Sequence, residues 1–556
     1  MKKYYIGICC FLSLFLLHSC AQIGTITGGE KDTQPPKILK QNPENNTTNF
    51  KDNIISITFD EYVELVNPTE TFRLSPTTDN SPNISIKGKT VVIDLKECDL
   101  KENTTYILSC EKGIKDFTEG NMLPSSKFVF STGDFIDSMH IAGNIKNAFT
   151  MSAEKNVAVF LYTDNEDSTL KNTLPLYITY TDNNGNFCFT NLPNQIFYIA
   201  ALVDKNSNNL FDQADEQIAF LNQAIEPTIA NKTDTNNNTI IDYTQIELKL
   251  FTEEDTVLKF IKRELAYDFV HKFIFKNKVE DFSLQQITSL DSTIHYLFAK
   301  NQTSDTILVF FLDTINSIFD FEMNVNQTLK DTISLNPCQK AKLKRRTQET
   351  PRLNYNISQN GDLFHRLQIT FSYPIVRYNN EAYFSLLLAK DSTTDTIAVG
   401  FHFIDEIQQT LELDYDFAIE NQAYTFICAD SLFYNHFGWS NDTIKLNATT
   451  KSTRDFGNMQ VAFQFYEANH FIAELLNEKN AVVQTDSMQF NKKIDYNNLL
   501  PGKYRLRLIV DENDNGRWDS GNYLQRKQPE KVIYSDKTFE ILANWKIEET
   551  FDVVIK

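Results

Sequence analysis

Two nine-residue segments carry oxygen-bearing side chains at the spacing of a calcium loop. The first runs from Asp204 to Asp212, and the second runs from Asp511 to Asp519. Each has Asp or Asn at positions 1, 3, 5 and 9, and carboxylate and amide oxygens at these positions are ligands that Ca²⁺ takes. The predicted ligands are Asp204, Asn206, Asn208, Asp212 and Asp215 in the first loop, and Asp511, Asn513, Asn515 and Asp519 in the second.

The two loops differ at the turn and at the position that closes the ligand shell. Position 6 requires a sharp turn; it is Gly516 in the second loop and Asn209, which tolerates left-handed backbone angles, in the first. Position 12 is Asp215 in the first loop but Asn522 in the second. Calcium is the one cofactor that the sequence suggests, and such a site would stiffen a domain junction without catalysing a reaction. The alternative interpretation is an Asx-rich turn that satisfies its own backbone amides.

The N-terminal residues indicate a different chemistry, the lipidation of a cysteine. Two lysines precede an apolar run, Ile6 to Leu17, which is shorter than the roughly 20 residues that cross a bilayer as a helix. The run therefore predicts a lipoprotein signal peptide over residues 1–19. It ends in Leu17-His18-Ser19-Cys20, which resembles the bacterial lipobox and makes Cys20 the acylated residue of a tether over 20–34. An ordinary signal peptide with an incidental cysteine is the alternative.

The sequence shows no arrangement that matches a catalytic motif. Zinc spacings such as CxxC and HExxH do not occur. Seven histidines follow Cys20, and none stands in a recognisable Ser, Cys or metal motif: His140, His271, His295, His365, His402, His436 and His470. We predict no enzymatic activity and no catalytic residues. The formal net charge of −20 argues against nucleic acid as a partner.

Alternating apolar and polar residues recur along the chain and predict strands. Ile55-Ser56-Ile57-Thr58-Phe59 and Tyr504-Arg505-Leu506-Arg507-Leu508 are two examples, and this period of two is typical of half-buried strands. The length of 556 residues favours several domains. We therefore predict an all-β chain of tandem β-sandwich domains.

The region after the tether resembles a bacterial Ig-like family of the S-layer type. The matching motifs occur in the order of that family, and the resemblance implies an Ig-like domain over residues 35–133. The pieces that carry it are Pro35-Pro36, Asn42-Pro43, Ile57-Thr58-Phe59-Asp60-Glu61, Leu74-Ser75-Pro76, Asn103-Thr104-Thr105-Tyr106, Ile114-Lys115-Asp116, Glu119-Gly120-Asn121 and Phe128-Val129-Phe130-Ser131-Thr132-Gly133.

The next region resembles a carboxypeptidase-regulatory-like, or transthyretin-like, sandwich. Val157 to Tyr162, Thr181 to Phe189 and Asn191-Leu192-Pro193 carry the resemblance, which implies such a domain over 137–221, with the first Asp/Asn loop inside it. Phe189 to Asp204 aligns without a gap with Tyr496 to Asp511. The repeat implies a second domain of this kind over 456–556.

Three further regions complete the predicted organisation. Residues 222–240 are rich in Asn, Thr and Asp and predict a linker. Residues 241–350 predict a β region without an assigned fold. Leu367 to Ile375 echoes Ile55 to Val63, and this weaker repeat predicts a second Ig-like domain over 351–450.

The tether and the tandem modules together predict a non-enzymatic scaffold or binding lipoprotein of the Bacteroidota envelope. Its expected partners are the bilayer, through acylated Cys20, and an envelope protein such as an outer-membrane β-barrel. We expect it in the outer membrane, and the sequence leaves open which face the body occupies. The alternatives are a glycan-binding surface lipoprotein, with aromatic side chains as a stacking platform, and a hydrolase whose site lies in 241–350.

Overall fold

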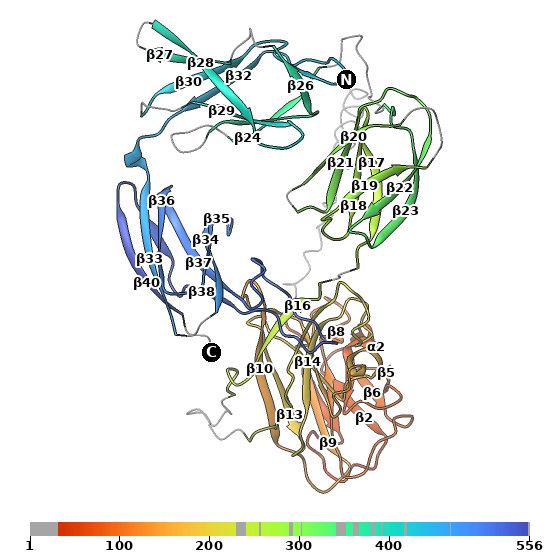
Figure 1. Cartoon of the computed structure of the whole chain (residues 1–556). Coiled ribbons are helices and arrows are strands. Elements are labelled where there is room, and N and C mark those ends of the chain that lie inside the picture. The colour runs from red at the N-terminus through yellow and green to blue at the C-terminus, as the bar shows by residue number, and fades with distance from the viewer. Residues whose placement is uncertain are drawn as a thin grey trace, which may run out of the picture. The chain divides into compact units, whose positions relative to one another are not determined.

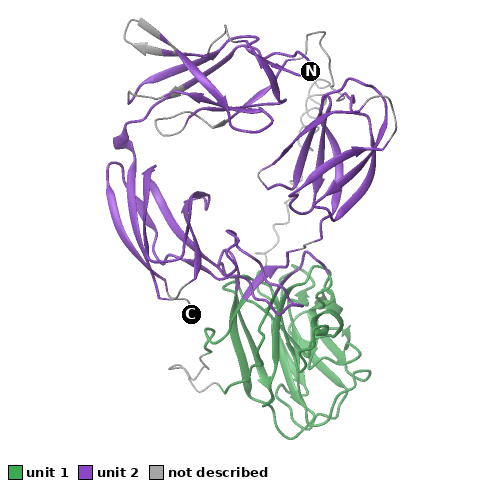
Figure 2. Ribbon diagram, viewed as in Figure 1, with its two compact units in different colours: residues 1–145, 153–212, 219–248 green, residues 146–152, 213–218, 249–556 purple. Residues whose placement is uncertain are grey.

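Residues with a described structure make up most of the chain in this computed structural model. They are residues 32–229, 241–254, 257–287, 293–301, 303–340, 352–359, 366–379, 384–390, 393–415, 420–466 and 469–553. Strands form nearly all of the regular structure (Figure 1), which confirms the predicted all-β fold of tandem sandwiches. The chain divides into two compact units, one of residues 1–145, 153–212 and 219–248, and the other of residues 146–152, 213–218 and 249–556 (Figure 2).

The first sandwich packs a four-stranded sheet, in the order β1-β2-β6-β5, against a three-stranded sheet, β4-β7-β9, with β3 and β8 forming a separate pair. In β2, Ile55, Ile57 and Phe59 are buried and the residues between them are not. The alternation read from the sequence therefore places one face of this strand in the core. The elements are β1 (Ile38–Asn42), β2 (Ile54–Phe59), β3 (Val63–Leu65), α2 (Pro68–Thr71), β4 (Phe72–Ser75), β5 (Asn83–Lys87), β6 (Thr90–Asp94), β7 (Thr105–Cys110), β8 (Ile114–Asp116) and β9 (Ser126–Ser131).

The second sandwich consists of strands on one continuous path, in the order β12-β11-β14-β15-β16-β10-β13. β11 pairs antiparallel with both β12 and β14, and β10 pairs antiparallel with β13. Its elements are β10 (Met139–Asn147), β11 (Ala158–Tyr162), α3 (Thr169–Asn172), β12 (Tyr177–Tyr180), β13 (Asn186–Leu192), β14 (Tyr198–Val203), β15 (Gln217–Phe220) and β16 (Glu247–Thr252).

β16 extends this sheet beyond the end predicted from the sequence. We expected the domain to end at 221 and a separate β region to begin at 241. β16 instead lies between β10 and β15 in the sheet of the second sandwich. It is not part of the following sandwich. The polar linker separates β16 from β15 in sequence, so local patterning assigns the strand to the wrong side of the boundary.

The third sandwich, within the region left unassigned by the sequence, packs the sheet β17-β18-β21-β20 against β19-β22-β23. Phenylalanine dominates its core, where Phe273, Phe282, Phe311 and Phe319 are all buried. Its strands are β17 (Phe260–Tyr267), β18 (Val270–Phe275), β19 (Phe282–Gln286), β20 (Tyr296–Lys300), β21 (Thr306–Phe311), β22 (Phe319–Val325) and β23 (Leu329–Leu335).

The fourth sandwich repeats part of the first. Its short pair β26-β31 corresponds to β3-β8, and β30 pairs with β32 as β7 pairs with β9. A seven-stranded path, β24-β25-β29-β28-β27-β30-β32, makes up the rest. The strands are β24 (Tyr355–Gln359), β25 (Gln368–Phe371), β26 (Ile375–Tyr378), β27 (Phe384–Lys390), β28 (Thr393–Phe403), β29 (Thr410–Asp414), β30 (Ala423–Cys428), β31 (Phe433–Asn435) and β32 (Ile444–Thr449).

The fifth sandwich has the connectivity of the second. β33 pairs with β36 as β10 pairs with β13, and β34 lies between β35 and β37 as β11 lies between β12 and β14. The repeat in sequence thus has a counterpart in strand order. The elements are η2 (Thr453–Asp455), β33 (Gly457–Phe465), β34 (His470–Asn477), β35 (Val482–Met488), β36 (Lys492–Leu499), β37 (Gly502–Asp511), β38 (Val532–Tyr534), β39 (Phe539–Ile541) and β40 (Lys546–Val553).

Helices are few and short in the described part of the chain. None of those that the structure describes has the length and apolar character needed to cross a bilayer.

Candidate metal sites in two Asp/Asn loops

The two Asp/Asn loops occupy equivalent places in the second and fifth sandwiches. Asp204 directly follows β14, and Asp511 is the last residue of β37. β14 pairs antiparallel with β11, and β37 pairs antiparallel with β34. Because a paired strand ends at the start of each loop, the backbone of the first carboxylate residue of each candidate site is held in place.

Asp204 organises the first loop by accepting hydrogen bonds from the backbone. Its Oδ2 accepts the N–H of Asn209 at 2.7 Å, and its Oδ1 accepts the N–H of Asn208 at 3.3 Å. Asn208 Oδ1 in turn accepts the N–H of Leu210 at 2.8 Å. Asn209 has a φ of 59°, which is the left-handed conformation predicted for position 6.

The far end of the first loop closes on Asp212. The side-chain amides of Asn206 and Asn208 donate to its two oxygens at 3.0 and 2.7 Å. The structure therefore brings four predicted ligand residues together. The fifth, Asp215, is exposed, whereas its neighbour Glu216 is fully buried and accepts the N–H of Gln213 at 3.1 Å.

The second loop repeats the backbone hydrogen bonds of this pattern, but both of its side-chain amides donate to one oxygen of Asp519. Asp511 Oδ2 accepts the N–H of Gly516 at 2.8 Å, and its Oδ1 accepts the N–H of Asn515 at 3.1 Å. Gly516 has a φ of 75°, so glycine meets the requirement of the turn. The amides of Asn513 and Asn515 donate to Asp519 Oδ2 at 2.5 and 2.9 Å.

These contacts are those of the Asx-rich turn, and they gather the residues of the predicted calcium sites. The oxygens of positions 1, 3 and 5 accept backbone N–H groups in both loops. The carboxylate of position 9 accepts side-chain amide hydrogens. Whether an ion binds either loop stays a prediction at this level, because both interpretations require the same residues in the same places.

A buried glutamate behind the second loop was not predicted from the sequence. Glu530 is 2 % exposed; its Oε1 accepts the N–H of Glu512 and its Oε2 accepts the N–H of Asp519, each at 2.9 Å. Burial raises the pKa of Glu530; the two N–H donors oppose this, and the carboxylates of Asp519 and Asp511 raise the pKa further. Sequence reasoning missed Glu530 because it stands outside the loop, and Pro529 before it was the one local signal of an ordered backbone.

The two end carboxylates of the second loop are more deeply buried than those of the first, although residues 512–517 between them are exposed. Asp511 is 3 % exposed and Asp519 is 8 % exposed, whereas Asp204 is half-buried and Asp212 is exposed. Asp519 Oδ1 is buried and accepts no hydrogen bond. The nearest cation in the described contacts is Arg517, whose Nε lies 3.3 Å from Asp519 Oδ1 on a side chain that is 57 % exposed.

A segment from outside the fifth sandwich contacts residues 520–523, just after the second loop, and both belong to the same compact unit. Glu254 N–H donates to Ser520 Oγ at 3.1 Å, and the N–H of Tyr523 donates to the carboxylate of Glu253. Phe251 packs so closely on Gly521 that a Cβ there would lie 2.5 Å from the ring. A glycine is therefore required at this contact.

The first loop is held by a cation from the first sandwich, again within one unit. Arg73 Nη1 donates to Asn209 Oδ1 at 3.0 Å. The Arg73 guanidinium also lies 5.3 Å from the centre of the Tyr180 ring, a cation–π distance. Each Asp/Asn loop thus lies at a junction between structural elements, as the sequence-based hypothesis of a stiffened junction requires.

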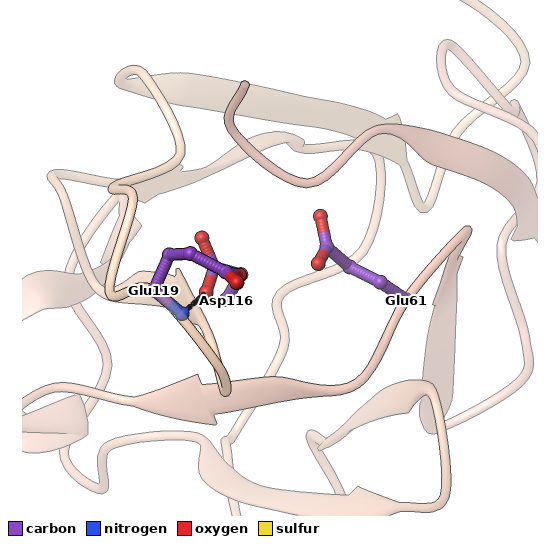
Figure 3. A group of neighbouring side chains, drawn as sticks. All are labelled: Glu61, Asp116 and Glu119. Atoms are coloured by element: carbon purple, nitrogen blue, oxygen red, sulfur yellow. Dashed lines mark hydrogen bonds between the residues drawn. The ribbon is translucent and has the colours of Figure 1, made fainter. Parts of the chain in front are cut away.

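A third acidic group, in the first sandwich, was quoted from the sequence only as part of the Ig-like motifs. Glu61, Asp116 and Glu119 place carboxylate oxygens within 4.8 Å of one another (Figure 3). Burial alone would raise the pKa of Asp116, but N–H groups at Gly120, Glu119 and Asn121 donate to its carboxylate and hold the pKa below its usual value. Burial, and then the charge of Asp116, raises the pKa of Glu61. Asp116 therefore closes the turn before β9.

Comparison with a family model decides the identity of the first sandwich. Residues 32–132 match the model described as a bacterial Ig-like domain. The chain carries a bacterial Ig-like domain. This confirms the resemblance of that region to bacterial Ig-like proteins, and the finer S-layer and transthyretin-like resemblances stay predictions. No curated protein matches the chain.

Solved structures with many sandwiches overlap the chain loosely. The TIE protein of Bacillus anthracis is 10 % identical with a TM-score of 0.14, covering 94 % of this chain and 75 % of that one. The major pilin subunit BcpA of Bacillus cereus is 8 % identical with a TM-score of 0.14, covering 74 % and 99 %. The S-layer protein rSbsC is 12 % identical with a TM-score of 0.13, covering 91 % and 67 %. We draw nothing about function from overlaps at this level.

Cys20, the predicted lipidation site, and the signal peptide lie outside the described residues.

Proposed function

We propose that this protein is a non-enzymatic lipoprotein, anchored in the outer membrane through Cys20, that serves as a scaffold for another envelope protein. The observation that carries the proposal is the set of specific contacts that join neighbouring sandwiches within each of the two units. Domains joined by small polar contacts normally move relative to each other. Within each unit, neighbouring sandwiches are instead joined by specific contacts, which suits a scaffold.

The junction in the first unit supports this proposal. The N–H and Oγ1 of Thr77 in the first sandwich donate to the carbonyls of Leu176 and Pro175, at 2.9 and 2.8 Å. The N–H of Asp137 donates to Thr105 Oγ1 at 3.0 Å. These bonds join β-rich regions through backbone groups, which hold orientation better than long charged side chains do.

An aromatic cluster closes a junction in the second unit. Phe269, between β17 and β18, lies with its ring centre 4.6 Å from that of Phe437 and 5.9 Å from that of Trp439. Tyr373 Oη donates to the carbonyl of Asp268 at 3.0 Å. Aromatic pairs at such distances add about 0.5–1.5 kcal/mol each beyond their buried area, so the third and fourth sandwiches are joined firmly.

The Ig-like domain offers a surface on which a partner can dock. Tyr62 and Phe117 are 61 % and 70 % exposed, and they are neighbours because the N–H of Phe117 donates to the carbonyl of Tyr62 at 3.0 Å. Exposed aromatic side chains are enriched at protein interfaces. We assign this aromatic pair to the partner-binding surface.

Affinity purification from intact cells tests the proposal. We expect the tagged protein to recover a stable envelope partner, and Tyr62→Ala with Phe117→Ala to reduce the recovered partner at least fivefold. Phe490→Ala is the matched control, since Phe490 is also exposed but lies in the fifth sandwich. Protease shaving of the same cells assigns the membrane face. Recovery of no partner would overturn the proposal. So would a Cys20→Ala variant that stays bound to the membrane as the wild type does.

The same aromatic pair favours glycan binding as a second candidate function. Aromatic faces stack on apolar faces of sugar rings, and the nearby carboxylates of Glu61 and Glu119 can accept hydroxyl hydrogens. A glycan-binding surface would bind purified envelope polysaccharide in the absence of any protein, with the affinity lost in the Tyr62→Ala variant. A scaffold would bind none.

A further inference from the structure

We propose that the second Asp/Asn loop binds one Ca²⁺ ion through oxygens of Asp511, Asn513, Asn515 and Asp519, and that the ion strengthens the contact of this loop with residues 251–254. The site is separate from the partner-binding surface, so the scaffold function does not depend on it. Buried charge, an oxygen without a hydrogen bond, the loop amides and the ligand chemistry support this assignment.

The first step is the balance of buried charge. Asp511 and Asp519, at the two ends of the loop, and Glu530 behind it are each more than nine-tenths buried. Buried carboxylates require a cation or a dense set of donors. Arg517, the cation that the described contacts place beside them, is more than half exposed and bridges to Glu254 as well. A divalent cation would balance the remaining negative charge.

The second step is an oxygen without a hydrogen bond. Asp519 Oδ1 is buried and accepts none, although its partner Oδ2 accepts two side-chain amides from the loop. Buried polar atoms are satisfied in the great majority of cases. Oδ2 of this carboxylate faces the loop amides, whereas the Nε of Arg517, 3.3 Å from Oδ1, is the one cationic partner that the described contacts give Oδ1.

The third step concerns the amides of positions 3 and 5. The Nδ2 atoms of Asn513 and Asn515 donate to Asp519 and occupy the place of a cation. A half-turn of each amide exchanges nitrogen for oxygen without moving the backbone. The half-turn breaks the turn hydrogen bonds of 3.2 and 3.0 Å that the two amide oxygens accept, and the attraction between a divalent ion and buried carboxylates offsets that loss.

Glu530 positions the loop and stands outside the ligand set. Both of its oxygens accept backbone N–H groups, one from each end of the loop. The second loop has Asn522 at position 12, where a calcium loop normally places an acidic residue. Glu530 supplies the missing negative charge from behind the loop and keeps the ends of the loop together.

The fourth step is the choice of ion. All the candidate ligands are oxygens, which suits Ca²⁺ better than Zn²⁺, an ion bound mostly by nitrogen and sulfur. Mg²⁺ requires near-ideal octahedral geometry and keeps several waters, whereas one short loop with mixed amides and carboxylates suits a flexible shell. We expect the affinity of extracellular calcium modules, with a Kd of about 10⁻⁴ to 10⁻³ M.

Terbium luminescence tests the site directly, because Tb³⁺ replaces Ca²⁺ and is excited by a nearby tryptophan. Trp518 is position 8 of the second loop, whereas the first loop has Phe211 there. We expect saturable Tb³⁺ luminescence from the mature full-length chain in detergent. Added Ca²⁺ should reduce this luminescence by displacing Tb³⁺. Asp519→Asn should weaken Tb³⁺ binding at least tenfold, and Trp518→Phe should remove the signal while calorimetry still detects Ca²⁺.

Matched variants keep the test decisive. Asp212→Asn, the equivalent change in the first loop, should leave the luminescence unchanged. Asn513→Ala, at an exposed position, should weaken binding about threefold to tenfold without unfolding the domain, which covers the case in which Asp519→Asn fails to fold. The absence of saturable Tb³⁺ luminescence, no displacement of Tb³⁺ by 10 mM Ca²⁺ (about ten times the weakest expected Kd), or wild-type binding in folded Asp519→Asn or Asn513→Ala would overturn the proposal.

Discussion

The first and second Asp/Asn loops have the same hydrogen-bond pattern in different surroundings. In both, position 1 accepts the N–H groups of positions 5 and 6, and the amides of positions 3 and 5 donate to position 9. The first loop is open to solvent at Asp212, whereas Asp511 and Asp519 in the second are buried. The turn is a property of nine local residues, and the burial is a property of what packs on them.

The difference shows how one loop sequence can serve two junctions. At the first loop, a single arginine from the Ig-like domain binds the amide of Asn209. At the second, residues 251–254 contact residues 520–523 just after the loop, and Glu530 accepts backbone N–H groups at both ends of the loop. The solvated carboxylate of Asp212 needs no further charge balance, whereas Asp511 and Asp519 at the ends of the second loop, with Glu530 behind it, are buried and do.

Removal of the Glu530 carboxylate behind the second loop has the largest expected effect on the free energy of unfolding. Glu530→Ala leaves the buried N–H groups of Glu512 and Asp519 without an acceptor, and each such donor costs about 1–3 kcal/mol. We expect a loss of about 3 kcal/mol in the free energy of unfolding of the fifth sandwich. Urea unfolding followed by peptide-resolved amide exchange measures it.

The matching change in the first loop calibrates that result. Glu216→Ala removes the acceptor of the Gln213 N–H, and we expect a smaller loss, about 1–2 kcal/mol. Glu530→Gln keeps one acceptor and should fall between wild type and Glu530→Ala. An equal or larger effect of Glu216→Ala would show that the two loops do not differ as their burial indicates.

Truncation of the first carboxylate compares the loops directly. Asp511→Ala and Asp204→Ala each remove the acceptor of two backbone N–H groups. We expect a loss of about 2 kcal/mol for Asp511→Ala and about 1 kcal/mol for Asp204→Ala, because water reaches the orphaned groups in the first loop. Thermal unfolding of the two variants in EDTA measures these losses. A larger loss for Asp204→Ala than for Asp511→Ala would contradict the comparison.

Loss of the arginine at the first loop should have a moderate effect confined to the first unit. Arg73→Ala removes a hydrogen bond to Asn209 and a cation–π contact with Tyr180. We expect a loss of about 1 kcal/mol, with faster amide exchange in both the loop and β4. Arg73→Lys, which keeps the charge but loses the planar fork, should recover only part of the loss.

The smallest effect on stability is expected for the arginine of the second loop. Arg517 and Glu254 are both more than half exposed, and exposed ion pairs contribute about 0–1 kcal/mol. Arg517→Ala should therefore leave the unfolding free energy within about 0.5 kcal/mol of wild type. It should also tighten Ca²⁺ binding, since it removes a competing cation from Asp519. Weaker Ca²⁺ binding in a calorimetric titration would count against the proposed site.

Local pattern predicts the strands and the loops well, because both depend on neighbours in sequence. The alternation around Ile57 and the left-handed turn at Asn209 follow from residue type and spacing. The match of residues 32–132 to the bacterial Ig-like model follows from motifs in order. These features need no knowledge of distant contacts.

The environment of each loop could not be predicted in the same way. Arg73 meets Asn209 across 136 positions of sequence, and Glu253 meets Tyr523 across 270. Glu530 carries no motif spacing that marks it as the partner of Asp519. β16 was assigned to the wrong region for the same reason, since its neighbours β10 and β15 precede a polar linker. Long-range pairing decides these features, and a single sequence does not reveal it.

Amide hydrogen exchange of the wild-type chain, with and without Ca²⁺, tests the central contrast between the two loops most directly. The account predicts slower exchange at Glu512, Gly516 and Asp519 than at Asn208 and Asn209, because the acceptors of the second loop are buried. It also predicts that 5 mM Ca²⁺, which is several times the weakest expected Kd of about 10⁻³ M, adds protection in the second loop alone. Equal exchange in the two loops, or Ca²⁺ protection of the first loop only, would contradict it.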